Sequence, residues 1–277
     1  MPKPPKSQPA QKTQSKLNRT SAAANTKLDL SSFESFRDHP LVIPSIQRYH
    51  RDVILADAAV KVLVTDLENL NEEHEKSFGR VAFITIEGRV KTEDSFLKKL
   101  YIETRESSKS RGITAATLST LYAGIRDLAG VRFSCPYFDQ VTNAITSFVR
   151  PRLSELGHAT DLRPRIKDKD YLDRGDERGY RSYHFFVNVS TPTDIFGNRE
   201  LCLCEVQARS ELQHVWAVKS HDLLYKMGAG WYFSDKDVVE DMRQVSNSLR
   251  AADQSLISIR DRIVKVRDAS AVSKPKS

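Results

Sequence analysis

The sequence predicts an α+β domain in which a mixed β-sheet is flanked by helices, with one long helix before the sheet and another after it. Two observations lead to this prediction. Apolar side chains recur every three or four residues over 46–70 and again over 238–263, which is typical of amphipathic helices. Between these stretches, short segments rich in β-branched residues alternate with further helical patterns, which indicates strands and helices of one domain.

The strand and helix signals follow one another closely along the chain. Strands are expected over 81–90, 129–134, 180–189 and 201–208. Helices are expected over 46–78, 93–101, 118–122, 138–156, 211–227 and 238–263. Thr92 is placed to cap the second helix, and Ser210 with Gln213 is placed to form a capping box for the helix that starts at 211.

The last helix has the spacing of a coiled-coil seam. Its apolar residues step by four and three, at Val238, Met242, Val245, Leu249, Ala252, Leu256, Ile259 and Ile263. This face could pack against the matching face of the 46–78 helix, or against a second subunit to form a homo-oligomer. The pattern leaves both arrangements open.

The positive charge of the chain is concentrated at its start. The net charge is +7 over 277 residues, and residues 1–28 hold six basic and no acidic side chains. This segment is too polar to bury a core, so we expect a disordered basic tail, with RNA or tRNA binding as the functional alternative. We expect the domain over 40–268, its most informative part over 80–228, and a second disordered tail over 269–277.

Composition also bears on the cellular setting. The sequence has no run of 18 apolar residues, so no membrane-spanning helix is expected. Its three cysteines, Cys135, Cys202 and Cys204, form no even disulfide framework and no metal-binding spacing. A reducing, cytoplasmic location is therefore expected.

A first group of candidate site residues surrounds the start of the second helix. Arg89 and Lys91 are two apart at a strand end and project in the same direction, whereas Ser95 and Lys99 are four apart on one helix face. Together with backbone amides at the helix N-terminus, these side chains would suit a triphosphate. Charged helix faces are usually only solvated, so this cluster alone is a weak signal.

A second group contains two carboxylates. Asp127 precedes a buried strand that carries Arg132, and Glu205 lies on an otherwise apolar strand. A carboxylate there must be paired or bound to a metal, because an unpaired buried charge is costly. Asp127 and Glu205 would together form a Mg²⁺ site suited to moving phosphoryl groups. The alternative for Asp127 is a structural ion pair with Arg132.

The strand expected over 180–189 has one apolar face and one mixed face. Tyr180, Ser182, His184 and Phe186 alternate on the mixed face, which should line a site. Gln207 shares a face with Glu205 on the neighbouring strand, and we assign His184 a binding role only. His214 and His221 lack further zinc ligands at suitable spacing and are expected to pack or to hydrogen-bond to the sheet.

Taken in order, these segments resemble the synthetase domain of the RelA/SpoT family of alarmone synthetases. The matching motifs are Arg89-x-Lys91-x3-Ser95-x3-Lys99, Asp127-x2-Gly130-x-Arg132, Gly179-Tyr180-x-Ser182-x-His184, Glu205-x-Gln207-x-Arg209, and Leu212-Gln213-x2-Trp216-Ala217 through Tyr225-Lys226. They cover more than half of the chain. The resemblance implies a nucleotidyltransferase-like mixed sheet. It also implies transfer of the β,γ-diphosphate of ATP to the 3′-hydroxyl of GDP or GTP, with Mg²⁺, to make guanosine tetra- or pentaphosphate.

The resemblance also implies roles for individual residues. Residues at the ATP site would be Arg89, Lys91, Ser95, Lys99 and Arg132. Asp127 and Glu205 would hold Mg²⁺, and Glu205 would act as the base for the 3′-hydroxyl. Tyr180 would stack on the acceptor base, with His184 and Gln207 at its ribose or phosphates.

The chain departs from the family pattern before Gly179. Family synthetases often carry a basic, proline-containing run here, whereas residues 172–178 are acidic on balance and lack proline. Substitutes for that run could come from Lys167, Lys169, Arg174 or Arg178. The departure raises an alternative, a toxin-type pyrophosphokinase acting on tRNA 3′ ends or adenosine nucleotides. A non-catalytic nucleotide sensor or RNA-binding module is a third hypothesis. With its one His-Asp pair, His221-Asp222, in the synthetase region, the chain is expected to be a stand-alone enzyme without the family's hydrolase domain.

Overall fold

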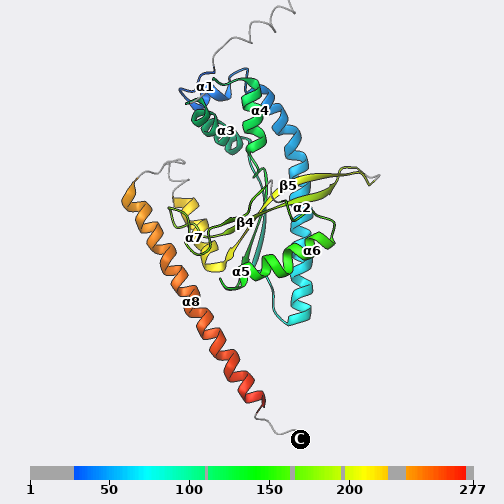
Figure 1. Ribbon diagram of the computed structural model, residues 1–277, viewed down its shortest axis with the longest axis vertical. Helices are drawn as coiled ribbons and strands as arrows, with labels where there is room; N and C mark the ends of the chain where they lie inside the picture. The colour runs from blue at the N-terminus through cyan, green and yellow to red at the C-terminus, as the bar shows by residue number, and fades with distance from the viewer. Residues whose placement is uncertain (1–27, 110–111, 163–165, 195–196, 224–234, 273–277) are drawn as a thin grey trace, which may run out of the picture. The chain divides into compact units, whose positions relative to one another are not determined.

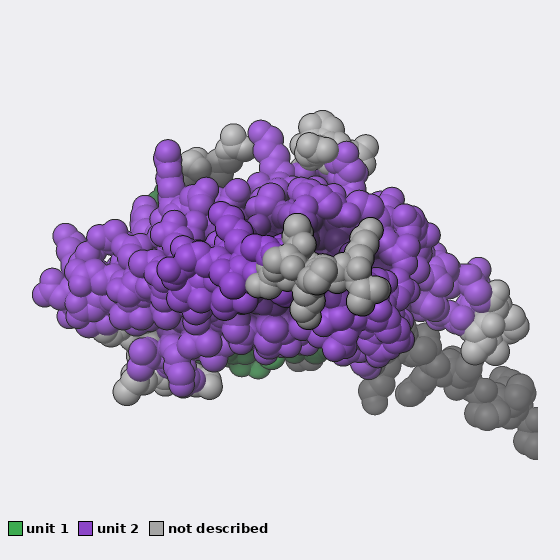
Figure 2. All heavy atoms as spheres, turned by 90° about the horizontal axis from the view of Figure 1, so that it is seen from below, with its two compact units in different colours: residues 1–50, 92–125 green, residues 51–91, 126–277 purple. Residues whose placement is uncertain are grey.

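The computed structural model describes residues 28–109, 112–162, 166–194, 197–223 and 235–272 (Figure 1). The chain forms two compact units, which Figure 2 colours separately. The first comprises Met1–His50 with Thr92–Ile125, and the second comprises Arg51–Lys91 with Arg126–Ser277. None of the described helices combines the length and the apolar character needed to cross a membrane.

The first unit is helical. It contains α1 (Phe33–Arg37), the beginning of α2 (Ile43–Phe78), α3 (Glu93–Ser108) and α4 (Ala115–Gly124). Its core includes a stack of rings, in which Phe96 lies 5.2 Å from Tyr49 and 4.9 Å from Tyr122 between ring centroids. The expected cap of α3 is confirmed, because the Ser95 amide donates a hydrogen bond to Thr92 Oγ1.

The second unit is built on a mixed sheet, as the sequence predicts, but the sheet has five strands, because a short strand over 169–170 adds to the four expected. The strands are β1 (Thr85–Val90), β2 (Ala129–Cys135), β3 (Lys169–Asp170), β4 (Tyr183–Pro192) and β5 (Arg199–Ser210), in the order β1-β2-β5-β4-β3. The β2–β5 pair is parallel, and the other neighbouring strands are antiparallel. Gly130 on β2 lies opposite Glu205 on β5, and Gln207 lies between Arg132 and His184.

One face of this sheet packs against the hydrophobic core. Alternate residues of the strands, such as Val131, Phe185 and Val206, are fully buried there. They pack with Leu63 and Leu67 of α2 and with the segment made of α5 (Gln140–Asn143), a π-helical turn (Ala144–Val149) and α6 (Arg150–Glu155). The polar residues predicted to line a site therefore lie on the opposite face, because neighbouring strand residues point to opposite sides.

Two predicted strands start later than expected. Instead of joining the sheet, the amides of Ala82 and Phe83 donate to Asn71 Oδ1 of α2, so β1 begins at Thr85. Before β4, Asp176 and Tyr180 close a turn, in which the Tyr180 amide donates to Asp176 Oδ1 and the Asp176 amide donates to the Tyr180 carbonyl. The prediction that Tyr180 lies within a strand was therefore wrong.

The two last helices are α7 (Glu211–His221) and α8 (Lys236–Val272). Ser210 caps α7, but the side chain of Gln213 reaches Ser246 of α8 instead of completing the predicted capping box. The end predicted for α7 lies outside the described residues. Helix α8 continues past the boundary expected at 268, and Leu28, placed in the basic tail by the sequence, is buried. The rest of that tail lies outside the described residues.

The predicted seam of α8 is only partly its buried face. Val245, Leu256, Ile259 and Ile263 are exposed, whereas the inward face contains Ser246 and Asp253. The inward face is shifted by about one residue from the apolar stripe, so α8 packs on α7 through a partly polar surface.

Gly88 permits the close approach of β1 and α2. A Cβ atom added to Gly88 would lie 2.5 Å from Val60 Cγ1 and 3.0 Å from Val64 Cγ2. We therefore expect Gly88→Ala to lower the free energy of unfolding by about 1–3 kcal/mol through overpacking. Urea denaturation would measure this loss. Gly124→Ala is the control, since a Cβ there meets open space, and equal stability of the two variants would contradict the packing argument.

Candidate functional site

The site is organised around a buried carboxylate on β5. Glu205 is 9% exposed. Its Oε1 lies 3.2 Å from His184 Nδ1, and its Oε2 accepts a hydrogen bond of 2.9 Å from Gln207 Nε2. Both partners come from the strand register, which places His184 opposite Gln207. The carboxylate is therefore held in a fixed orientation by its own strand and the next.

These contacts keep Glu205 ionised. Burial alone would raise the pKa of Glu205, but the hydrogen bond and charge of His184 and the hydrogen bond of Gln207 outweigh it, so the pKa lies below its ordinary value. The charge of Asp127 acts in the opposite direction on the same pKa, which means that the two carboxylates lie within electrostatic range. At neutral pH, Glu205 can accept a proton or bind a cation.

Asp127 forms an ion pair with Lys91. Its Oδ2 lies 2.8 Å from Lys91 Nζ, and the lysine side chain is only 3% exposed. Arg132 instead donates from Nε to Gln207 Oε1 at 3.1 Å. The structure therefore shows a Lys91–Asp127 pair in place of the Asp127–Arg132 pair that the sequence suggested as an alternative.

A magnesium site at Asp127 and Glu205 would need ligands from outside the protein. The described residues contain no group of three or more histidine, cysteine, aspartate or glutamate side chains placed around one metal ion. Mg²⁺ commonly takes only one or two carboxylates from the protein and completes its shell with water and substrate phosphates. That Asp127 and Glu205 together hold Mg²⁺ therefore stays a prediction.

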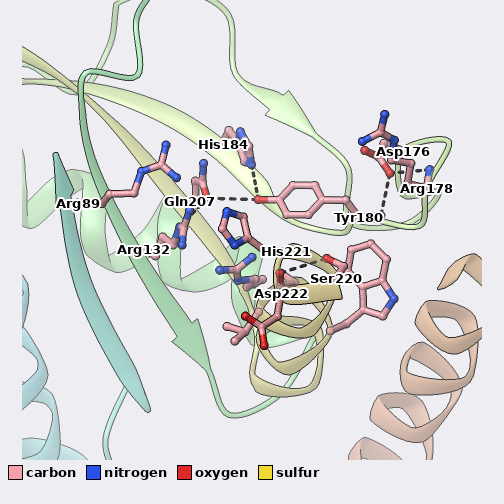
Figure 3. A pocket seen from close by; sticks show the side chains of 14 residues that line it. Arg89, Arg132, Asp176, Arg178, Tyr180, His184, Gln207, Ser220, His221 and Asp222 are labelled. Atoms are coloured by element: carbon pink, nitrogen blue, oxygen red, sulfur yellow. Dashed lines mark hydrogen bonds between the residues drawn. The ribbon is translucent and has the colours of Figure 1, made fainter. Parts of the chain in front are cut away.

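A pocket of about 500 Å³ is lined by His184 and Gln207, the two residues that contact the Glu205 carboxylate (Figure 3). Its lining includes Arg89, Arg132, Arg178 and Arg209, the predicted acceptor residues Tyr180, His184 and Gln207, and Trp216, Ser220, His221 and Asp222 around α7. The arginines make the pocket suitable for a polyanion. Ser95 and Lys99 belong to α3 in the first unit, and their predicted contact with ATP phosphates stays a prediction.

Tyr180 extends across this pocket. Its hydroxyl lies 2.9 Å from His184 Nε2 and 3.3 Å from Gln207 Oε1. Figure 3 shows Arg89 and Arg132 near the hydroxyl end of the ring, and Asp176 and Arg178 near its backbone. If Tyr180 donates to Nε2, His184 can donate from Nδ1 to Glu205 in its neutral form. One chain of hydrogen bonds then joins the pocket to the buried carboxylate.

Arg209 falls within one of the matching motifs, but no role was predicted for it. The Arg209 side chain is about 2% exposed, and its Nε has no hydrogen-bond partner in the described part of the chain. The guanidinium lies 6.0 Å from the Tyr180 ring centroid and lines the pocket. The strand alternation that joins Glu205 and Gln207 also includes position 209, so this residue could have been found from the sequence.

Of the two histidines of α7, His214 agrees with a packing role, whereas His221 is exposed and lines the pocket. His214 is buried, and its Nε2 lies 3.9 Å from Glu87 Oε1 on β1. Burial and then the charge of Arg209 lower the pKa of His214, so its neutral form is favoured at pH 7. Trp216 is buried and also lines the pocket.

Comparison with known proteins places this site in a family. Residues 88–230, just over half of the chain, match the model described as a region found in RelA/SpoT proteins. This span contains every site residue discussed above. Two Bacillus subtilis relatives, named GTP pyrophosphokinase YwaC and YjbM, are 22% and 24% identical to the chain. The matches cover 79% and 80% of this chain and 93% of each relative.

Solved structures share the fold. Small alarmone synthetase 1 from Bacillus subtilis, bound to its product pppGpp, matches with a TM-score of 0.61 at 23% identity, over 79% of this chain and 99% of that one. A GTP pyrophosphokinase family protein from Streptococcus pneumoniae matches with a TM-score of 0.57 at 24% identity, over 82% and 98%. Because the family region spans more than half of its residues, the chain belongs to the RelA/SpoT family.

Proposed function

We propose that the protein is a GTP pyrophosphokinase that transfers the β,γ-diphosphate of ATP to the 3′-hydroxyl of GDP or GTP. The observation that carries this proposal is the buried Glu205 carboxylate, which is held by His184 and Gln207, two residues of the arginine-lined pocket. Family membership and the names of the two Bacillus subtilis relatives support the same reaction class.

In this reaction Glu205 accepts the proton of the acceptor 3′-hydroxyl as its oxygen attacks the β-phosphorus of ATP. The bond between that phosphorus and the oxygen bridging to the α-phosphate breaks, and AMP leaves. The hydrogen bonds from His184 and Gln207 orient the Glu205 carboxylate for this transfer. Asp127 and Glu205 would hold Mg²⁺, which supplies charge neutralisation for the phosphates when bound.

The cations of the site would act by positioning and charge stabilisation. Arg89 and Arg132 both line the pocket, and after burial the charge of Arg89 is the main cause that lowers the pKa of Arg132. Two guanidinium groups this close favour a bound polyanion, so we assign them to ATP with Lys91, Ser95 and Lys99. The acceptor nucleotide is assigned to Tyr180, His184 and Gln207, with Arg209 as an added cation.

The acidic segment before Gly179 is compatible with a nucleotide acceptor. Asp176 uses Oδ1 to accept hydrogen bonds from the amides of Arg178 and Tyr180, so this carboxylate serves the turn. Arg178 lines the pocket and offers a cation where family members often carry their basic run. We therefore favour guanosine nucleotides over the alternative acceptors, tRNA 3′ ends and adenosine nucleotides.

The reaction is tested with a panel of acceptors. Purified protein, ATP and Mg²⁺ should yield a pyrophosphorylated product with GDP or GTP, resolved by chromatography, and little with ADP or tRNA. Glu205→Gln should lower turnover by about 10²- to 10⁴-fold, because the base and its charge are lost. Glu200→Gln, at the exposed start of β5, should retain activity. Product formed only with tRNA or adenosine nucleotides would establish the alternative function.

Tyr180 tests the acceptor assignment. If its ring stacks on the acceptor base, Tyr180→Ala should raise the acceptor KM by about 10- to 100-fold and leave the ATP KM nearly unchanged. Tyr180→Phe keeps the ring and removes the hydroxyl that contacts His184, so most acceptor affinity should remain. Steady-state kinetics with each substrate varied would show this, and an unchanged acceptor KM in Tyr180→Ala would place the base elsewhere.

We also propose a contact with a second copy of the chain through the apolar stripe of α8. Leu256, Ile259 and Ile263 are 45%, 43% and 63% exposed, and the intramolecular contacts of α8 use a different face. An apolar stripe at heptad spacing over 238–263 is typical of a helix that pairs with another helix.

The contact is tested by the mass of the particle in solution. Ile259→Glu with Ile263→Glu should reduce the mass measured by light scattering, because each buries a charge in the proposed seam. Ser258→Glu, which lies off both faces of α8, is the control and should keep the wild-type mass. A wild-type protein that is already monomeric at micromolar concentration would rule out the contact.

A further inference from the structure

The inward face of α8 holds the turn that carries Tyr180. Ser246 Oγ donates a hydrogen bond of 2.5 Å to the Gly179 carbonyl. Arg181 Nη2 donates a hydrogen bond of 2.9 Å to Asn247 Oδ1. Gly179 and Arg181 are the two neighbours of Tyr180. Ser246 thus holds the backbone just before this tyrosine, and Asn247 holds the side chain of the residue just after it.

The turn lies directly on the helix backbone. Gly179 has a φ of +92°, and a Cβ added to it would lie 2.9 Å from Ser246 Cβ and 3.0 Å from Arg243 Cα. Any side chain at this position would therefore meet both a strained backbone conformation and the helix itself. This contact explains why a glycine precedes Tyr180, and it requires α8 to be in place.

The same face of α8 reaches two other walls of the pocket. Trp216 Nε1 of α7 donates to the Met242 carbonyl at 2.8 Å. At the end of β5, Ser210 Oγ donates to Asp253 Oδ2 at 2.5 Å, and Asp253 is 1% exposed. Burial raises the pKa of Asp253, and the bond from Ser210 compensates part of its lost hydration. Helix α8 thus contacts the turn, α7 and the end of the strand that carries Glu205.

We propose that α8 is a positioning element of the acceptor site, in which Ser246 and Asn247 hold the Gly179–Arg181 turn so that the Tyr180 hydroxyl reaches His184 and Gln207. This inference rests on the proposed function. Neither residue lines the pocket, so both act through Tyr180 and not on a nucleotide directly.

A purely structural role of α8 predicts different effects of α8 variants on the two substrates. A helix that only covers α7 would affect stability and both substrates alike when its contacts are removed. A helix that positions Tyr180 affects the acceptor selectively, because Arg89 and Arg132 of the ATP assignment lie on β1 and β2, away from the turn that α8 holds.

The experiment compares variants of α8 in the full chain. Ser246→Ala with Asn247→Leu removes both hydrogen bonds to the turn, and Asn247→Asp alone keeps an acceptor for Arg181. Ser248→Ala is the matched control, because its hydroxyl bonds only within the helix, to the Gln244 carbonyl. We measure the KM of each substrate, kcat, direct GDP binding by calorimetry, and thermal unfolding.

We expect the double variant to raise the acceptor KM and the GDP dissociation constant by about tenfold, as the loss of two ordinary hydrogen bonds implies. Its ATP KM and its kcat at saturating acceptor should stay within about twofold of wild type. Asn247→Asp and Ser248→Ala should resemble wild type.

Equal changes in the KM of both substrates, or unchanged GDP binding in a folded double variant, would overturn the positioning role of α8 but leave the proposed function standing. A wild-type protein that neither binds GDP nor forms product with guanosine nucleotides would instead remove the proposed function, and this inference with it.

Discussion

The candidate site depends on one buried carboxylate that remains charged. A glutamate on a sheet face is destabilised by the loss of hydration unless its oxygens receive hydrogen bonds. Glu205 receives one on each oxygen, from His184 and from Gln207. The His184 bond follows from the pairing of β4 with β5, since a shift of one residue would turn His184 toward the core, whereas Gln207 reaches Glu205 along β5 itself.

Gln207 links the two halves of the site. Its amide nitrogen donates to Glu205, which obliges its oxygen to face the other way, and that oxygen accepts from Arg132 Nε. The residue assigned to ATP and the proposed base are therefore joined through one side-chain amide. Tyr180 reaches the same group from the acceptor side. Donor and acceptor assignments thus converge on a single hydrogen-bond network across β2, β5 and β4.

The sequence predicted the parts of this arrangement that depend on periodicity. Alternation along β5 separated Glu205 and Gln207 from the buried Cys204 and Val206, and the Thr92 cap followed from residue type alone. The ion-pair partner of Asp127 was harder to predict, because basic side chains lie both at the end of β1 and on β2. Periodicity could not show that Asp127 would form its ion pair with Lys91.

Polar packing explains the other differences. The buried face of α8 was assigned by hydropathy, but Ser246 and Asp253 lie inward because hydrogen bonds to Gly179 and Ser210 satisfy them. An apolar pattern cannot reveal such a face. Likewise, tyrosine is common in strands, but the Tyr180 amide donates a hydrogen bond to Asp176 Oδ1 and therefore lies in a turn. In both places a specific side-chain hydrogen bond outweighed the regular pattern.

The most direct test of this account is the pKa of Glu205 itself. Carbon NMR of protein labelled at the glutamate carboxyl, with the signal assigned by its absence in Glu205→Gln, would follow the titration of this group. The account predicts a midpoint below the ordinary glutamate value of about 4.3, and a higher midpoint when His184 is replaced by alanine. A midpoint above the ordinary value in the wild-type protein would contradict the ionised carboxylate on which the proposed reaction depends.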